Sequence, residues 1–528
     1  MAFTLLGFTI SWSLVGALVA LLVGREVWKL TYFKRHGIPG PGALPFLGNI
    51  ITIGKKGFHF AFLEFNEKYG KVFGVFMFGQ PVIVTSDPEM VREIAVKSFS
   101  NFINHPSSAL TNRPFDKGLF NLKGQKWKNT RSIITPTFSG SKIRKMSDLV
   151  NECCDLLVRN IKGDRCEAVD VSRFFEAFTL DGIARCAFGL QVDSQNNPND
   201  PFITNAKKII FGKTFQWKTM LAGLVPPLAH LMNFLDVKTM PPDVINFFSS
   251  VTEEAISMRE NKLVTEDQKD FLRLLINAHK LSDTDTIGER KRAEDVTDVH
   301  NRLDEHHNTG YFLDTKKDNP KLTKEEIVGQ GLFFFIAGYE TTSTTLGFIA
   351  YSLATNPEVQ DKLIQEVDEV TPDRDSVNYR SIAKMTYLDG VVCETLRMYP
   401  PAALTNRICN ETFTYKGVTI PKGMHVLLAV FSIHYNPEFW PNPKEFDPER
   451  FSKERSEGRH PFAWMPFGAG PRHCIGMRFA LMEIKMAIVR LLQKFRFETC
   501  SKSEVPVKLG TRNVKPEKGI VLSVIERK

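Results

Sequence analysis

The sequence predicts a mainly α-helical fold with a small β region (α+β), and three features support this assignment. The stretch 323–355 is a continuous helix candidate that ends before an Asn-Pro pair, where the chain is steered away from helical geometry. The amphipathic stretch 477–495 is a second one. Against these stands one clear hairpin, in which the β-branched and aromatic runs 71–78 and 82–85 are separated by Gly79-Gln80-Pro81. Helices should therefore form most of the body.

The composition is that of a well-packed globular protein. The 528 residues are 43% hydrophobic and 24% charged, which excludes a disordered or collagen-like chain. The 68 basic and 59 acidic residues leave a net charge of +9, but no Lys/Arg block of the nucleic-acid-binding kind accompanies it, so no nucleic acid partner is expected. The eight cysteines are sparse and form no C-x-x-C pair, which favours a reducing compartment.

The N-terminus predicts a membrane location. Residues 2–24 carry no charge, and as a helix they would span about 35 Å, enough to cross a bilayer. The basic residues that follow from Arg25 place the rest of the chain in the cytosol. A cleavable signal is the alternative, but the run lacks a basic start and is too long. We therefore expect a transmembrane signal-anchor at 1–24, a basic and Pro/Gly-rich hinge at 25–49 and a catalytic domain at 50–528.

Two further segments keep alternative interpretations. The apolar stretch 211–235 is interrupted by Pro226-Pro227, so it either dips into a membrane surface or forms a buried helix pair. The stretch 279–321 contains 18 charged residues among 43 and is expected to be an exposed, mobile loop. Its histidines at 300, 306 and 307 are more typical of solvated side chains than of a metal site.

The strongest chemical motif is the glycine-rich loop Phe467-Gly-Ala-Gly-Pro-Arg-His-Cys-Ile-Gly476, which precedes the amphipathic stretch at 477. A cysteine before a helix faces unpaired N–H groups and the positive end of the helix dipole, which should lower its pKa and favour an anionic metal ligand. Cys474 has no second Cys or His nearby for a zinc or iron–sulfur site, but one thiolate suffices as the proximal ligand of a haem. An inert buried cysteine is the alternative.

This F-x-x-G-x-x-x-C-x-G spacing resembles the haem-binding loop of the cytochrome P-450 family of haem-thiolate monooxygenases. The resemblance covers about residues 38–528 and implies one α-rich body with a small β region, and haem b held by Cys474 and packed by Phe467. The residues of the motifs are similar to those in the branch of steroid- and drug-oxidising liver enzymes and their invertebrate relatives. The charged insertion near 279–321 departs from that branch.

The helix candidate at 323–355 opens with a capping box formed by Thr323 and Glu326. Within it, Phe333, Ala337 and Thr341 recur at intervals of four and share one face. Small residues and threonines alone would equally suit an ordinary buried helix. The segment Ala337-Gly-Tyr-Glu-Thr-Thr342 resembles the oxygen-activating motif of the family, which implies that Glu340 and Thr341 deliver protons to bound oxygen.

Two other motifs follow the family order. Glu394 and Arg397 have the i, i+3 spacing of a helical ion pair, and by resemblance they form a buried, structural network with Arg450 from the stretch Phe446-Asp-Pro-Glu-Arg-Phe451. The motif Trp127-Lys-Asn-Thr-Arg131 provides a cation suited to the haem propionates. Similarity to the family assigns propionate binding to Trp127 and Arg131, and also to Arg472 and Arg407.

The resemblance implies an enzyme of the endoplasmic reticulum membrane that uses O2 and NADPH-derived electrons to hydroxylate or epoxidise a lipophilic small molecule of the steroid, fatty-acid or xenobiotic class. The expected electron donors are an NADPH-dependent flavoprotein reductase and a cytochrome b-type protein, and Lys126, Lys128 and Arg472 are candidates for docking the reductase. The pocket is expected within 101–122, 333–337, 402–405 and 509–511. A haem-thiolate isomerase or dehydratase, and a non-enzymatic haem sensor, are the alternative functions.

Overall fold

The architecture comes from a computed structural model, which describes residues 2–5, 8–106, 110, 113–164, 167–190, 192–197, 199–211, 218, 221–222, 226–238, 240–261, 271–280, 322–372 and 377–527. The helices are α1 (Trp12–Leu30), α2 (Tyr32–Arg35), α3 (Ile50–Lys56), α4 (Phe58–Tyr69), α5 (Pro88–Arg92), α6 (Gly124–Ile134), α7 (Gly140–Gly163), α8 (Val171–Phe188), α9 (Pro201–Phe211), α11 (Pro226–Phe234), α12 (Pro242–Glu260), α13 (Phe271–Lys280), α15 (Lys324–Thr355), α16 (Pro357–Val370), α17 (Tyr379–Ile382), α18 (Thr386–Met398), α19 (Val430–His434), α20 (Lys453–Ser456) and α21 (Met477–Leu492). The strands are β1 (Ala2–Leu5), β2 (Phe8–Ser11), β3 (Val72–Met77), β4 (Gln80–Thr85), β5 (Val169–Asp170), β6 (Thr405–Ile408), β7 (Phe413–Tyr415), β8 (Val418–Ile420), β9 (His425–Leu428), β10 (Phe495–Glu498) and β11 (Val521–Glu526).

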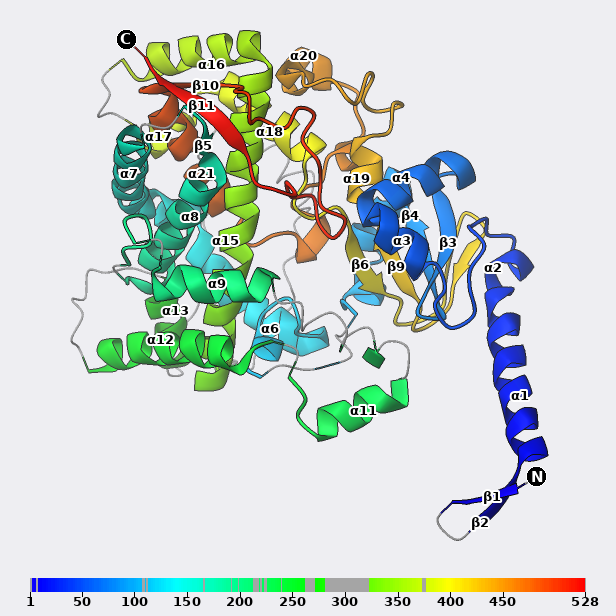
Figure 1. Ribbon diagram of the computed structural model, residues 1–528. Coiled ribbons are helices and arrows are strands. Elements are labelled where there is room, and N and C mark those ends of the chain that lie inside the picture. The colour runs from blue at the N-terminus through cyan, green and yellow to red at the C-terminus, as the bar shows by residue number, and fades with distance from the viewer. Residues whose placement is uncertain are drawn as a thin grey trace.

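Most of the body is helical (Figure 1): the strands β3, β4, β6 and β9 lie beside α3 and α4, and β5, β10 and β11 lie apart from them, among the helices. The largest sheet has the order β3-β4-β9-β6, with β4 and β9 parallel and the other neighbours antiparallel. A second sheet pairs β10, β11 and β5. The mainly α fold with a small β region is therefore confirmed.

Several local predictions are also confirmed. β3 and β4 form the expected antiparallel hairpin. α5 begins at Pro88, and the Asp87 carboxylate caps it by accepting a hydrogen bond from the Glu89 backbone N–H. α15 begins one residue after Thr323, whose hydroxyl accepts from the Glu326 backbone N–H, while the Glu326 carboxylate accepts from the Thr323 N–H.

The N-terminus differs from the prediction. Residues 2–11 do not continue a helix, because β1 and β2 pair as antiparallel strands, and the helix α1 starts only at Trp12. Phe3, Thr4, Thr9 and Ile10 are β-branched or aromatic, and such side chains favour extended backbone. Across the parts of the chain that the structure covers, no helix combines the length and the apolarity needed to cross a bilayer. The predicted transmembrane helix at 2–24 is thus not found.

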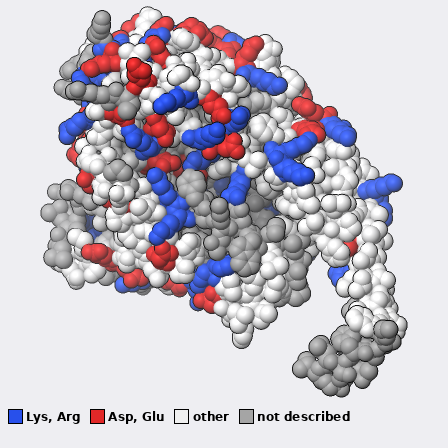
Figure 2. Space-filling model, in the orientation of Figure 1, with Lys and Arg blue, Asp and Glu red and all other residues white. Residues whose placement is uncertain are grey.

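α1 projects from the body as a mainly uncharged rod (Figures 1 and 2). Its exposed side chains include Trp12, Leu14, Leu21 and Trp28. The Pro/Gly segment that follows is fixed against the sheet, because the Gly74 backbone N–H donates to Pro39 O at 2.8 Å.

The apolar stretch 211–235 is described only in part. Its helix α11 buries Ala229 and Met232 but exposes Leu231 and Phe234, and Leu235 directly after the helix is also exposed. The charged stretch expected as a loop lies, from residue 281 to 321, outside the described residues, and so do its three histidines.

The centre of the helical part is α15, which crosses the body beside α8 (Figure 1). Gly338 permits this close contact, since a Cβ at this position would lie 2.3 Å from Ile183 Cδ1 on α8. The Thr179 hydroxyl of α8 also donates to the Tyr339 carbonyl of α15 at 3.2 Å. α8 therefore fixes the backbone of α15 next to the motif that carries Glu340 and Thr341.

Candidate active site at Cys474

Cys474 lies in a loop whose shape depends on its glycines. Gly468 and Gly470 have positive φ angles of 76° and 69°, and a Cβ on Gly470 would lie 1.8 Å from the Ala95 carbonyl oxygen. The loop closes because the Cys474 backbone N–H donates to Phe467 O at 2.8 Å. Gly476 then caps α21. The spacing of Phe467, the glycines and Cys474 in the motif therefore matches the geometry of this loop.

The Cys474 thiol differs from the expectation in one respect. The backbone N–H groups of Gly476 and Met477 and the charge of Arg131 lower its pKa, as expected for a position before a helix, but desolvation is the larger effect and leaves the pKa raised. The side chain is nevertheless exposed. An accessible thiol that is closely surrounded by protein atoms suits contact with a bound group rather than with bulk water.

A second exposed side chain occurs where α15 is otherwise covered. Thr341 is exposed, whereas every residue from 342 to 354 is buried. Ala337 and Phe333, about one and two turns before Thr341, are partly exposed, so the predicted common face exists. The Thr341 hydroxyl donates to Ala337 O at 2.7 Å. Glu340 points elsewhere, with its Oε1 atom 3.5 Å from Lys515 Nζ and 3.4 Å from Asn513 Nδ2.

The arginines predicted to hold propionates come together from three elements. Arg131 lies on α6, Arg407 on β6 and Arg472 in the cysteine loop. Burial and the charges of Arg407 and Arg131 lower the pKa of Arg472 to about 8. Burial alone lowers the pKa of Arg407 to about 10. Such mutual repulsion indicates that these side chains are arranged for an anionic partner.

Their hydrogen bonds support this view. The Arg407 Nε atom is buried and has no hydrogen-bond partner among the described residues. Arg472 donates to the carbonyls of Ile103, Leu119, Phe120 and Leu122, so it holds the loop before α6 and is not free to dock a protein. Its guanidinium lies 4.1 Å from the ring centre of Trp127. Lys126, another of the three predicted docking residues, pairs with Glu326 at 2.5 Å.

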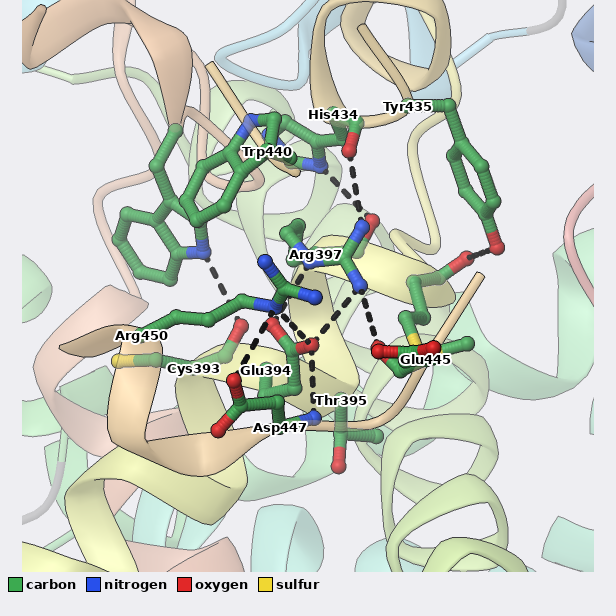
Figure 3. A network of polar contacts seen from close by, with 12 residues as sticks. Cys393, Glu394, Thr395, Arg397, His434, Tyr435, Trp440, Glu445, Asp447 and Arg450 are labelled. Carbon is green, nitrogen blue, oxygen red and sulfur yellow. Dashed lines mark hydrogen bonds and ion pairs between the residues drawn. The ribbon is translucent and has the colours of Figure 1, made fainter. Parts of the chain in front are cut away.

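The predicted buried network is confirmed (Figure 3). Both Glu394 oxygens accept from Arg397, at 2.7 and 2.8 Å, and Oε1 also accepts from Arg450 Nε at 3.2 Å. The Arg397 Nη1 donates to His434 O, and the His434 Nε2 atom accepts from the Met465 N–H at 3.0 Å. Met465 lies two residues before Phe467, so the network ties α18 to the start of the cysteine loop.

Sequence reasoning missed several residues of this region. Lys515 and Asn513 contact Glu340, and Glu176 contacts Lys515, but none of the three belongs to a motif. His105 stacks on Phe120, and burial together with Arg407 and Arg472 lowers its pKa to about 3. Within the predicted pocket stretch 101–122, residues 107–109 and 111–112 lie outside the described residues. The remainder contacts α15, since the Phe120 and Phe333 rings stack at 6.3 Å.

The residues present fit a haem. A thiol ligand, buried cations with an unpaired N–H and an exposed stretch of α15 match an iron, two propionates and an oxygen-binding face. Among the described residues, no group of three His, Cys, Asp or Glu side chains could hold a separate metal ion, and none of the described cysteines forms a disulfide.

The sequence model of the family described as "Cytochrome P450" matches residues 38–299 and 287–524. The chain is 36% identical to Cytochrome P450 3A29 of Sus scrofa over 529 residues, which cover 98% of this chain and 97% of the relative. It is also 36% identical to Cytochrome P450 3A6 of Oryctolagus cuniculus and 34% identical to Cytochrome P450 3A56 of Fundulus heteroclitus, with 98% of this chain covered in each case. The chain belongs to the cytochrome P450 family and is a haem b-dependent monooxygenase.

Proposed function

We propose that the protein hydroxylates or epoxidises lipophilic small molecules of the steroid, fatty-acid or xenobiotic class. The observation that carries this proposal is the exposed Thr341 on the apolar face of α15 that also bears Phe333 and Ala337. Phe115 and Phe120 approach the same face, with ring centres 6.2 and 6.3 Å from that of Phe333. Aromatic walls favour an apolar substrate by excluding water from it.

The residues that hold the haem follow from the arrangement of charges. Cys474 supplies the iron ligand, and Phe467 packs beside it in the same loop. Arg131, Arg407 and Arg472 neutralise the two propionates. The Trp127 ring packs against the guanidinium of Arg472 and holds it in place. The haem, once bound, supplies the redox chemistry that splits O2, with one oxygen atom entering the substrate and the other leaving as water.

The protein must then control protons and water. The Thr341 hydroxyl donates its hydrogen to Ala337 O, so its lone pairs point away from the helix and can accept a hydrogen bond from water. Rotation about the Cβ–Oγ1 bond would turn the hydroxyl hydrogen outwards instead. Glu340, one residue earlier, supplies a carboxylate that can restore the proton. We assign proton delivery to these two residues.

The electrons have to come from another protein, and we propose the NADPH-dependent flavoprotein reductase, with a cytochrome b-type protein as a second donor. We place the protein at the endoplasmic reticulum membrane with its catalytic domain, residues 50–528, in the cytosol. Residues 1–24 attach it, and 25–49 link the attachment to the domain. The exposed apolar residues of α1, and Phe234 and Leu235 at the end of α11 and directly after it, support contact with lipid.

Thr341→Ala tests the oxygen-activation role, with Thr345→Ala as its matched control. Both hydroxyls donate to the carbonyl four residues earlier, at 2.7 and 2.8 Å, but Thr345 is buried. We expect Thr341→Ala to lower the product formed per NADPH oxidised by about tenfold or more, with peroxide or water released instead. Thr345→Ala should stay near wild type. An unchanged ratio in Thr341→Ala, or turnover without a reductase, would favour the isomerase alternative.

Removal of residues 2–24 tests the membrane assignment. The truncated chain should lose most of its binding to microsomal vesicles and still bind haem, because no residue of that segment lies in the candidate site. Vesicle binding equal to that of the full chain would contradict the role given to residues 1–24.

A further inference from the structure

The C-terminal segment after β10 reaches back to the middle of α15. It contacts this helix at two places. The Tyr351 hydroxyl accepts a hydrogen bond from the Val507 N–H at 3.0 Å. The Glu340 carboxylate accepts a hydrogen bond from Asn513 and forms an ion pair with Lys515. Eleven positions separate Glu340 from Tyr351, which corresponds to about three helical turns. The segment therefore lies along the helix and ends beside the acid of the oxygen-activating motif.

The local geometry of this segment directs two polar side chains to Glu340. Val514 is buried in the main core, with 1% of its surface exposed. The backbone turns at this point, because the Lys515 N–H donates to Asn513 O at 2.9 Å, and the side chains that flank Val514 in the sequence both reach Glu340. Both contact Oε1 of Glu340, at 3.4 and 3.5 Å. One carboxylate oxygen is thus held, and a carboxylate has a second oxygen that can take part in a further hydrogen bond.

Lys515 also connects Glu340 to a second carboxylate. Its Nζ atom lies 3.7 Å from Glu176 Oε1 on α8, and Glu176 in turn lies 3.8 Å from Lys207 Nζ on α9. The charges alternate along this series, from the half-exposed Lys207 to the partly buried Glu340. Opposite charges at each step compensate the carboxylate of Glu340, whose side chain is 25% exposed.

We propose that Lys515 is a positioning residue for Glu340, which acts from the C-terminal segment by holding one oxygen of the carboxylate through an ion pair. A glutamate at position i+1 or i−1 of a helix points about 100° away from its neighbour, so Glu340 does not face the same way as Thr341 without help. Lys515 fixes Oε1 and leaves Oε2 to hand a proton to water beside Thr341. This inference rests on the proposed role of Glu340.

Two measurements test the ion pair and its effect. The first is independent of turnover. The holoenzyme is treated briefly with an amine-acylating reagent, and the modification of Lys515 is compared by peptide mass spectrometry with that of Lys508. Lys508 lies in the same segment and pairs with Glu504 instead. We expect Glu340→Gln to raise the Lys515/Lys508 ratio about threefold or more, because the ammonium loses one of the carboxylates that shield it. An unchanged ratio would overturn the ion pair.

The second measurement is product formed per NADPH oxidised. Lys515→Met should lower this ratio about threefold to tenfold, a part of what general acid catalysis contributes, and Lys515→Arg should restore it to within about twofold. Lys508→Met, the matched control, should leave it unchanged. Equal ratios in Lys515→Met and wild type would overturn the positioning role, as would a loss in Lys515→Met that Lys515→Arg does not rescue.

The outcomes separate this inference from the proposed function. If Glu340→Gln and Thr341→Ala lower the ratio but Lys515→Met does not, oxygen activation stands and the positioning role fails. If Glu340→Gln itself has no effect on the ratio, the proposed role of Glu340 fails, and the acylation experiment still decides whether Lys515 holds it.

Discussion

Replacement of Glu394 by Gln should destabilise the protein strongly without creating a cavity. Glu394 is fully buried, and its two oxygens accept from Arg397 Nε and Nη2, from Arg450 Nε and from the Asp447 backbone N–H, at 2.7 to 3.2 Å. Gln keeps the shape but removes the charge, and its amide NH2 would face an arginine donor. Two buried guanidinium groups would then lie beside a neutral side chain.

The cost can be estimated from the type of interaction. Removing one partner of a buried ion pair costs about 3–5 kcal/mol, because the remaining charge stays desolvated and uncompensated. A total stability of about 5–15 kcal/mol would lose a large part of its value. An exposed pair contributes only about 0–1 kcal/mol, and Lys162–Glu526, with N and O 2.6 Å apart and both side chains more than half exposed, is such a pair. Glu526→Gln is therefore the matched control.

The assay is urea unfolding of the haem-loaded protein, followed by haem absorbance and by tryptophan fluorescence. Trp464 and Trp440 lie in the network region, because their Nε1 atoms donate to Cys393 O and Ala463 O. We expect Glu394→Gln to unfold at clearly lower urea and to lose haem early, whereas Glu526→Gln should unfold near the wild-type midpoint. Equal midpoints for the two variants would refute the view that the network is a charged structural element.

Three other predictions follow from single contacts. Cys474→Ser should abolish the red-shifted Soret band of the reduced carbon monoxide complex, and a persistent band would exclude Cys474 as the ligand. Arg407→Met should weaken haem retention in a transfer assay to apomyoglobin about tenfold, because the unpaired Nε would no longer meet a propionate; retention equal to wild type would remove it from the site. The third concerns His59, whose ring nitrogens have no partner among the described residues and whose pKa burial lowers to about 4. The unfolded chain takes up a proton at His59 below about pH 6.5, but the folded chain does so only below about pH 4. The free energy of unfolding therefore decreases by up to about 3 kcal/mol as the pH falls through this interval. His59→Phe should abolish this acid-dependent loss, which thermal unfolding scans at pH 5 and 8 would measure.

The sequence predicts those parts of the structure that depend on local chemistry. The capping box of Thr323 and Glu326, the hairpin of β3 and β4 and the loop around Cys474 each need particular residue types at fixed spacing, so the pattern carries the geometry. The proposal that three arginines bind the propionates came from the resemblance, and the proximity of these arginines is a property of the tertiary fold. No local pattern indicates that Arg131, Arg407 and Arg472 lie close enough to depress the pKa of Arg472.

Two expectations were wrong because a second effect outweighs the one considered. Residues 2–11 are apolar enough for a membrane helix, but many of them are of the β-branched and aromatic types that favour strands. They form β1 and β2, which pair with each other. The position of Cys474 before α21 does lower the pKa of its thiol, as expected, but the protein atoms around it raise that pKa by more. In the first case hydropathy favours a helix and strand pairing competes with it. In the second case the position before a helix lowers the pKa and burial by distant residues raises it. The competing effect is visible only in the folded structure.

The same distinction explains why the surroundings of Glu340 were missed. Glu340 was found because it precedes Thr341, whereas Lys515 lies 175 residues further on in a segment without any motif. That segment reaches α15 because Val514 is buried in the core and Val507 bonds to Tyr351, which are contacts of packing rather than of pattern. A motif identifies the groups that react, while the groups that orient them depend on how distant parts of the chain pack. Differences in proton delivery between relatives that share the Glu-Thr pair should therefore be sought first in the segment 507–515.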